Sequence, residues 1–474
     1  MKTGTEYSYG LKSTFAQCLM LTTTYLFNIS QGIDIMIPTV IVGSIRENND
    51  KYLPNVSDEQ LSWIASLVYL SPPLGSLFLS VFQNFLGHRI CMFITCLIQV
   101  SSVSVVFLSH DVQAIYWCTI LMGLSTGFAT NLNGSYSGEV CEPRLRGMLT
   151  SLLNVFFFSG YLFVSVVYAI TLNWRFSLLI TVAIPLMNLV VLIFTVDSPM
   201  WLLSRGKVEK AKRSLRKLRG NASEEKCAFE FKEMVEYVLK KSADKVEHLK
   251  DGSLQTTDLI NDLDDLWKPL TLMVVFIFFS NIMSGVPYTP YLLSIFKILK
   301  TPFDSAWAMT VYTGFAIIGN VLTIFMVHKF GKRFLVLLSY SVCSISYIGI
   351  GVIGTYAPVC LLTSWIQVTL FYLTSFASSL GIAPIVWILM CEVFPMKSKC
   401  IGCGISASTY FLLSFVMTKF YTNFELLAGF YNTFVIFGTL GVVGLIYLYK
   451  ELPETENRTL KEISDFFKTV PVKF

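Results

Sequence analysis

The chain is a succession of long apolar segments separated by short polar ones. A bilayer core of about 30 Å requires roughly 20 apolar residues per helix, and the sequence contains twelve segments of about that length, bounded by charged or turn-forming residues. They cover residues 14–42, 61–82, 90–108, 112–136, 149–170, 176–196, 270–296, 307–327, 334–354, 358–390, 404–421 and 428–449. We therefore predict an all-α membrane protein with twelve transmembrane helices.

One long hydrophilic segment divides these helices into two sets of six. We predict an N-terminal six-helix bundle over 1–196, a cytoplasmic linker with short helices over 197–268, a C-terminal six-helix bundle over 269–450 and a cytoplasmic tail over 451–474. Gly87-His-Arg89 in the first set recurs as Gly331-Lys-Arg333 at the equivalent loop of the second, which indicates an internal duplication. Two such bundles can rock about a site near the membrane midplane, which is alternating access.

The orientation follows from the basic residues in short loops, because cytoplasmic loops are enriched in lysine and arginine. One side has ten (Lys2, Lys12, Arg89, Arg144, Arg146, Lys329, Lys332, Arg333, Lys397 and Lys399), and the other has six (Arg46, Lys51, Arg175, Lys297, Lys300 and Lys419). We therefore expect both termini to be cytoplasmic in a multi-pass protein of the plasma membrane. Asn55-Val-Ser57 then lies in an outer loop and could accept an N-glycan.

Composition narrows the function further. Hydrophobic residues make up 54% of the chain and charged residues 14%, and the mean hydropathy of +0.60 is outside the range of soluble domains. The net charge of +5 is mostly the orientation signal, so we expect no nucleic-acid partner. The basic run 205–219 is predicted to form an amphipathic helix that faces lipid headgroups.

The eleven cysteines indicate neither disulfides nor a metal site. They are scattered through predicted helices and inner loops, and Cys400-Ile-Gly-Cys403 has no histidine near it in sequence. A nucleotide-driven pump is set aside because the chain has no Gly-x4-Gly-Lys-Ser/Thr motif. We expect no cofactor, no metal and no enzymatic activity.

Several loop motifs carry a resemblance to a known family. They begin at Glu139 (Glu-Val-Cys-Glu-Pro-Arg-Leu-Arg-Gly), Asp197 (Asp-Ser-Pro-Met-Trp-Leu-Leu), Glu392 (Glu-Val-Phe-Pro-Met-Lys-Ser-Lys) and Pro453 (Pro-Glu-Thr, followed by Arg458-Thr-Leu). In these motifs the chain resembles the sugar porter family of the major facilitator superfamily, and in particular the insect facilitated trehalose transporters. The resemblance implies the major facilitator fold and transport of a sugar, trehalose or hexose, or a similar polyhydroxylated solute, by facilitated diffusion.

The same motifs suggest a gate at the cytoplasmic ends of the helices. Opposite charges there can pair while the inner gate is shut and must separate when it opens; the alternative is an orientation signal with weak surface pairs. Asn84 and His328 stand where the family's motifs have aspartates, which predicts a looser gate. The gating candidates are Arg89, Glu139, Arg146, Arg333, Glu392 and Lys399.

The family's central site combines side-chain amides with an aromatic face for the sugar ring. Its positions fall here on Asn154 and Asn281, on Trp387 after the Gly381–Pro384 helix break, and on Tyr410 in place of an amide. Tyr291 is a further candidate for substrate binding. Several amides of the family are missing, so a solute other than a simple hexose stays open, and the remaining amides could instead bond across helices.

Asp34 is the one acidic residue within a predicted helix span. It matches an aspartate that, in proton-coupled members of the family, resembles a protonation site paired with an arginine; the arginine position is Thr119 here. Because no other predicted span holds a deep cation, we expect Asp34 to be neutral, or to titrate near neutrality, in at least one conformation. It could couple protons to transport, donate a hydrogen bond to backbone freed by Pro38 or to substrate, or lie wetted near the outer mouth without a role.

Two alternatives to a sugar carrier remain. The weakened site also fits a sugar sensor that no longer transports, although the tail after Tyr449 is short for a sensor. A proton-coupled carrier of another small solute is the second alternative. In each case the partners are a small-molecule solute and the lipid bilayer.

Overall fold

The fold was analysed in a computed structural model of the chain. It describes residues 11–47, 56–108, 111–223, 227–239, 256–358, 360–394, 399–456, 458 and 462. Within these ranges, the side chains at 11, 108, 143–148, 150–151, 256–265 and 400 are not described. The predicted glycan site at Asn55 and the side chain of the gating candidate Arg146 therefore lie outside the described part.

The described residues contain twelve helical segments that are long and apolar enough to cross a membrane. The first six are α1 (Leu11–Arg46), α2 (Asp58–Leu70) with α3 (Pro72–Leu86), α4 (His88–Leu108), α5 (Val112–Val140), α6 (Pro143–Thr171), and α7 (Trp174–Thr181) with α8 (Ala183–Phe194). The second six are α12 (Thr256–Met283), α14 (Ser305–Phe330), α15 (Lys332–Tyr356), α16 (Leu361–Ala377) with η2 (Ser378–Ile382) and α17 (Ala383–Glu392), α18 (Lys399–Ala428) and α19 (Phe430–Glu451). The predicted all-α, twelve-span fold class is confirmed.

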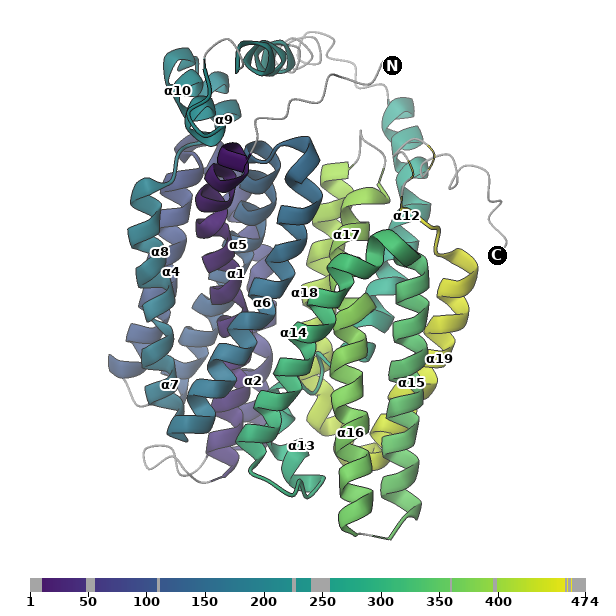
Figure 1. The fold of residues 1–474 in the computed structure, drawn as a ribbon. Coiled ribbons are helices and arrows are strands. Elements are labelled where there is room, and N and C mark those ends of the chain that lie inside the picture. The colour runs from purple at the N-terminus through teal and green to yellow at the C-terminus, as the bar shows by residue number, and fades with distance from the viewer. Residues whose placement is uncertain are drawn as a thin grey trace.

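The segment between the halves forms short helices at one end of the bundle. These are α9 (Pro199–Ser204), α10 (Val208–Leu218) and a helix over 227–239. We call this end the linker face; α1 begins there and α19 ends there (Figure 1). The opposite end, which we call the far end, carries η1 (Thr289–Tyr291) and α13 (Leu292–Ile298). α12 begins at Thr256, inside the segment that the sequence assigned to the linker.

The predicted continuous helix over 270–296 is wrong, because the chain breaks after Met283. Gly285 has a φ of +78°, a left-handed conformation that glycine adopts without strain. Pro287 follows and has no N–H to donate to a helix. The chain turns through 284–288 before η1 and α13 form, and hydropathy averaged over the segment does not reveal this turn.

Glycines let α1 lie unusually close to α6. A Cβ atom on Gly32 would fall 2.0 Å from the carbonyl oxygen of Phe157, and one on Gly160 would fall 2.1 Å from that of Ile29. Small residues permit such backbone contact between membrane helices. α1 is therefore held in the interior, and its polar residues are buried.

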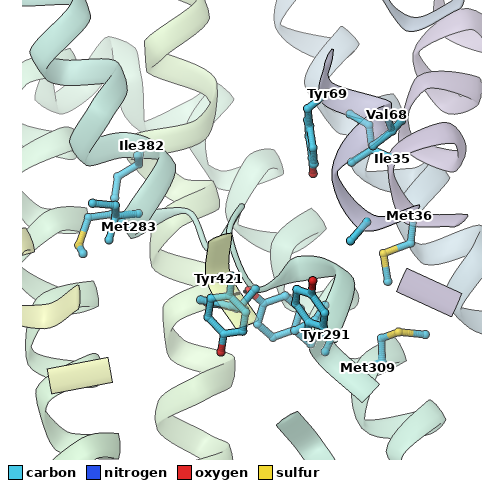
Figure 2. Packing of buried hydrophobic residues seen from close by; sticks show 14 of the residues in the cluster. Ile35, Met36, Val68, Tyr69, Met283, Tyr291, Met309, Ile382 and Tyr421 are labelled. Carbon is cyan, nitrogen blue, oxygen red and sulfur yellow. Dashed lines mark hydrogen bonds between the residues drawn. The ribbon is translucent and has the colours of Figure 1, made fainter. Parts of the chain in front are cut away.

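A single hydrophobic cluster runs through both halves of the molecule. Met36 and Tyr69 belong to it from the N-terminal half, and Met283, Tyr291 and Tyr421 belong to it from the C-terminal half (Figure 2). The candidate functional site is built on the residues between and around these side chains.

Candidate functional site

Aromatic side chains from both halves meet at the centre of the molecule. The indole of Trp387 on α17 is half-buried, and its ring centroid lies 5.1 Å from that of Tyr410 and 6.1 Å from that of Phe411, both on α18. From the other half, Tyr161 of α6 packs against the same hydrophobic cluster as Trp387 and Tyr410, a cluster that includes Tyr69 of α2. Such a surface offers aromatic faces and hydroxyls, which together suit a ring with both C–H and O–H groups.

A local π-helix positions Trp387. Pro384 has no N–H for the carbonyl of Leu380 four residues earlier, and the chain widens into η2 just before it. Thr323 of α14 replaces the missing donor: its hydroxyl lies 2.6 Å from the Leu380 carbonyl oxygen, the closest of its three carbonyl contacts. At the predicted break the span is therefore continuous but widened into a π-turn, and such turns are frequent at functional sites.

The two candidate amides are placed very differently. Asn281 is fully buried: its Nδ2 donates to the Ile277 carbonyl at 3.0 Å, and its Oδ1 accepts from Ser414 at 2.7 Å. In this conformation Asn281 joins α12 to α18 and has no surface for a ligand. Asn154 of α6 is half-buried and remains a candidate for contact with a solute.

Tyr291 lies at the contact between the halves at the far end. It is 1% exposed, its hydroxyl accepts from Thr422 at 3.1 Å, and its ring stacks on Tyr421 with centroids 5.2 Å apart. The guanidinium of Arg46, from the N-terminal half, lies over the same ring at 5.0 Å. This placement favours closure of the far end as the role of Tyr291.

Other polar contacts between described residues of the two halves also lie at the far end. Thr39 donates to the Thr289 carbonyl at 3.2 Å, and Lys297 pairs with Glu47 at 3.2 Å. The ammonium of Lys419 donates to the Ser62 hydroxyl at 2.7 Å. Each of these contacts joins the two halves at the far end.

At the linker face, Arg89 and Glu139 have partners in the N-terminal half and in the linker. Arg89 donates to the carbonyls of Leu192 and Ile193 at the end of α8, at 3.3 and 3.5 Å. Glu139 accepts from Ser198, and its Oε2 lies 3.9 Å from the Nε2 of His88. His88, which is next to Arg89 and 2% exposed, was not among the candidates from the sequence.

The C-terminal half has its own charged cluster at the linker face. Glu392 pairs with Lys332, whose ammonium lies 2.7 and 2.8 Å from the two carboxylate oxygens. The same ammonium lies 3.0 Å from Glu456, whose carboxylate also accepts a hydrogen bond from Nδ1 of His328 at 2.9 Å. Lys332, the neighbour of the predicted Arg333, is thus the central cation of this cluster.

Arg333 and Lys399 have other surroundings. The Arg333 guanidinium donates to the Tyr449 carbonyl, and its backbone N–H donates to Glu454 at 3.0 Å. Lys399 begins α18 and is half-buried. The role of these residues in gating stays a prediction.

Asp34 lies in the interior of the N-terminal half. It is 4% exposed, which disfavours a wetted position near the membrane surface. Thr119, at the position of the family's arginine, bonds to the carbonyls of its own helix. Asp34 is close to two polar side chains, Ser125 on α5 and the buried Gln99 on α4. The Oγ of Ser125 lies 2.7 Å from Asp34 Oδ2 and 2.7 Å from the Met122 carbonyl oxygen.

The geometry at Ser125 favours a neutral Asp34. A serine hydroxyl has one hydrogen, so it cannot donate to both the carboxylate and the Met122 carbonyl. If Asp34 carries a proton and donates it to Ser125, both contacts become hydrogen bonds, and no buried charge is left without a cation. The pairing of Asp34 with Ser125 could not be recognised in the sequence, because serine is common in membrane helices.

Comparison with known proteins places the chain in a family. The family model described as "Sugar (and other) transporter" matches residues 8–467. The facilitated trehalose transporter Tret1 of Apis mellifera ligustica is 26% identical over 428 residues, which cover 90% of this chain and 82% of that protein. The trehalose transporter 1 of Drosophila melanogaster is 22% identical over 445 residues, or 91% of this chain, and the match spans about half (51%) of that protein.

Solved structures agree on the fold. The major facilitator superfamily proton:xylose symporter XylE superimposes with a TM-score of 0.72 at 22% identity, covering 96% of this chain and 100% of that one. The peptide transporter POT superimposes with a TM-score of 0.61 at 13% identity, covering 91% and 93%. These matched proteins are transporters, not enzymes. The chain has the major facilitator fold and belongs to the sugar (and other) transporter family.

Proposed function

We propose that this protein carries a sugar, trehalose or a hexose, or a similar polyhydroxylated solute across the plasma membrane by alternating access, with the linker face and both termini in the cytoplasm. Family membership alone does not give the substrate, the orientation in the membrane or the residues that bind the solute. The observation that carries it is the aromatic site of Trp387, Tyr410 and Tyr161, which draws on both halves of the molecule.

The distribution of polar contacts supports alternating access. Thr39 and Glu47 of the first half contact Thr289 and Lys297 of the second at the far end. At the linker face, Glu392 pairs with Lys332 of its own half, and Glu139 lies near His88 of its own half. Contacts between the halves at the far end are expected of a carrier in the state that is closed to that side. In the opposite state the far-end contacts must separate.

Uptake into vesicles tests the function. The purified chain in lipid vesicles should take up labelled trehalose, glucose or another member of a polyol panel until the inside and outside concentrations are equal. Accumulation driven by an imposed pH gradient would instead indicate the proton-coupled alternative. Absence of flux for every solute, with ligand binding retained, would indicate the sensor, an alternative supported by the engagement of Asn281 with Ser414.

Trp387→Ala tests the proposed site. Loss of one stacking face should cost about 1–2 kcal/mol of binding, which raises KM about 5- to 30-fold, while Trp387→Phe retains most of the affinity. Trp117→Ala is the matched control, because that indole is 61% exposed on α5 and should leave uptake unchanged. Equal effects of the two alanine substitutions would show that Trp387 does not contact the solute.

A further inference from the structure

A cavity at the linker face lies outside the transport pathway proposed above. It has a volume of about 630 Å³ and forms where the first turns of α1, the end of α8 and the end of α10 meet. Its described lining includes the cationic side chains of Lys12 and Lys217, the amide of Asn221, and the apolar side chains of Phe15, Leu19 and Phe194. Neither the conducting site nor the gating candidates contribute to it.

The lining is ordered from charged to apolar along α1. Lys12, Phe15 and Leu19 follow one another at intervals of three and four residues, so they occupy one face of the helix. Seven residues of helix span about 10 Å, from the linker face toward the membrane interior. Phe15 and Phe194 are 72% and 71% exposed, as expected of side chains that meet lipid tails and not water.

The positively charged end is built by a close contact between α10 and α1. Gly220, with a φ of +67°, ends α10 directly against Lys12: a Cβ atom there would lie 2.9 Å from the Lys12 carbonyl carbon and oxygen. Asn221 continues in the same conformation and donates its N–H to the Arg216 carbonyl at 2.8 Å. This turn brings Lys217, in the last turn of α10, to the same cavity as Lys12.

The two ammonium groups have no acidic partner within 4 Å among the residues that the structure describes. Two cations and an amide donor beside an apolar, membrane-facing wall match a phosphate-containing headgroup joined to acyl chains. Phosphate alone would leave the wall of Phe15, Leu19 and Phe194 unoccupied. We propose that this cavity binds one anionic phospholipid, with its headgroup between Lys12 and Lys217 and an acyl chain along α1.

Such a lipid would hold the linker on the N-terminal half. α10 is already fixed there by Arg219, which donates to the Val140 carbonyl at 3.1 Å and lies 3.8 Å from Glu142. Glu142 in turn accepts from Ser13 and Gln17 of α1, at 2.7 and 2.6 Å. The lipid would add a second link between the same two helices, through Lys12, the residue before Ser13.

Native mass spectrometry of the full chain in neutral detergent tests the site. The probe is dioleoylphosphatidylserine, titrated against dioleoylphosphatidylcholine, with inorganic phosphate as the competitor. We expect one tightly bound phosphatidylserine, and the double variant Lys12→Gln/Lys217→Gln should weaken it about 30-fold, because each lysine near an anionic headgroup contributes about 1 kcal/mol. Millimolar phosphate should not displace the lipid.

A matched variant separates the cavity from general surface charge. Lys210→Gln/Arg213→Gln removes the same number of cations from exposed positions of α10 that do not line the cavity, and should change the affinity less than about threefold. Phe194→Ala should weaken binding of the dioleoyl lipid but not of its dihexanoyl analogue. Equal weakening by the two double variants, or displacement of the lipid by phosphate, would overturn the proposal whether or not the protein transports sugar.

Discussion

Lys419 provides the most direct test of how the far end is held shut. Its ammonium, on α18, donates to the Ser62 hydroxyl at 2.7 Å and lies 4.1 Å from the ring centroid of Trp63, both at the start of α2. Methionine has a similar length and no charge. We therefore predict that Lys419→Met shifts the equilibrium away from the state in which the far end is closed.

The size of the shift follows from the two contacts. A hydrogen bond from a charged donor contributes about 1.5 kcal/mol net, and a partly buried cation–π contact contributes about 1 kcal/mol. Their loss, about 2–2.5 kcal/mol, changes the ratio of the two states about 30- to 70-fold. Lys297, by contrast, is 65% exposed in its pair with Glu47, so Lys297→Gln should change the equilibrium by less than about 1 kcal/mol.

Pulsed electron resonance between spin labels at the far end can measure this equilibrium. Labels at Gln113 on α5 and Asn423 on α18 occupy exposed positions in different halves, in a background where the exposed Cys360 and Cys391 are replaced by serine. Lys419→Met should add a population at longer distance, and Lys297→Gln should not. An unchanged distance distribution in Lys419→Met, or an equal response to both substitutions, would refute the assignment of Lys419 as the main far-end contact.

Three further predictions concern the linker face, the π-helix and the buried acid. Burial raises the pKa of Glu456, but hydrogen bonds and charge from His328 and Lys332 outweigh it and hold the pKa below the usual 4.5. Protection of residues 452–456 from hydrogen exchange should therefore persist at neutral pH and be lost as the pH falls through that lowered value. In Lys332→Gln the protection should be lost at a higher pH. Thr323→Val should lower the free energy of unfolding by about 1–2 kcal/mol, because a buried carbonyl loses its donor, and a thermal unfolding curve unchanged from wild type would contradict this. Asp34→Asn should retain uptake with and without a pH gradient, since an amide can replace a neutral carboxylic acid; loss of a gradient effect that is present in the wild-type protein would identify Asp34 as a coupling site.

The sequence predicted the parts of the fold that depend on one helix at a time. Apolar length gave the twelve spans, and Gly381 and Pro384 indicated an irregularity at the place where the helix widens into η2 without breaking. It missed the turn after Met283, because the turn depends on the left-handed Gly285 and the apolar run continues through it. Averaged hydropathy does not distinguish a straight helix from a broken one of the same composition.

The sequence was less informative about which side chains meet. It pointed to Arg333 as a gating cation, yet the neighbouring Lys332 reaches Glu392, because adjacent residues on a helix point about 100° apart. It found no partner for Asp34 because it looked for a cation, and the structure supplies Ser125, a common residue in any membrane helix. Such pairs depend on the rotation and depth of each helix in the bundle, which are set by packing such as that of Gly32 against Phe157.

The contacts at the two ends of the molecule differ in how they affect the conformational equilibrium. At the far end, the contacts that must break on opening join the two halves, so each contributes directly to the difference in free energy between the states. At the linker face, the described pair of Lys332 with Glu392 lies within the C-terminal half, and that of Glu139 with His88 lies within the N-terminal half. Each pair can persist in both states unless a partner from the other half competes for it. Substitution of Lys419 should therefore change the conformational equilibrium directly. Substitution of Lys332 should first destabilise the C-terminal bundle. It should change the equilibrium only if Glu392 forms a contact with the other half when the linker face closes.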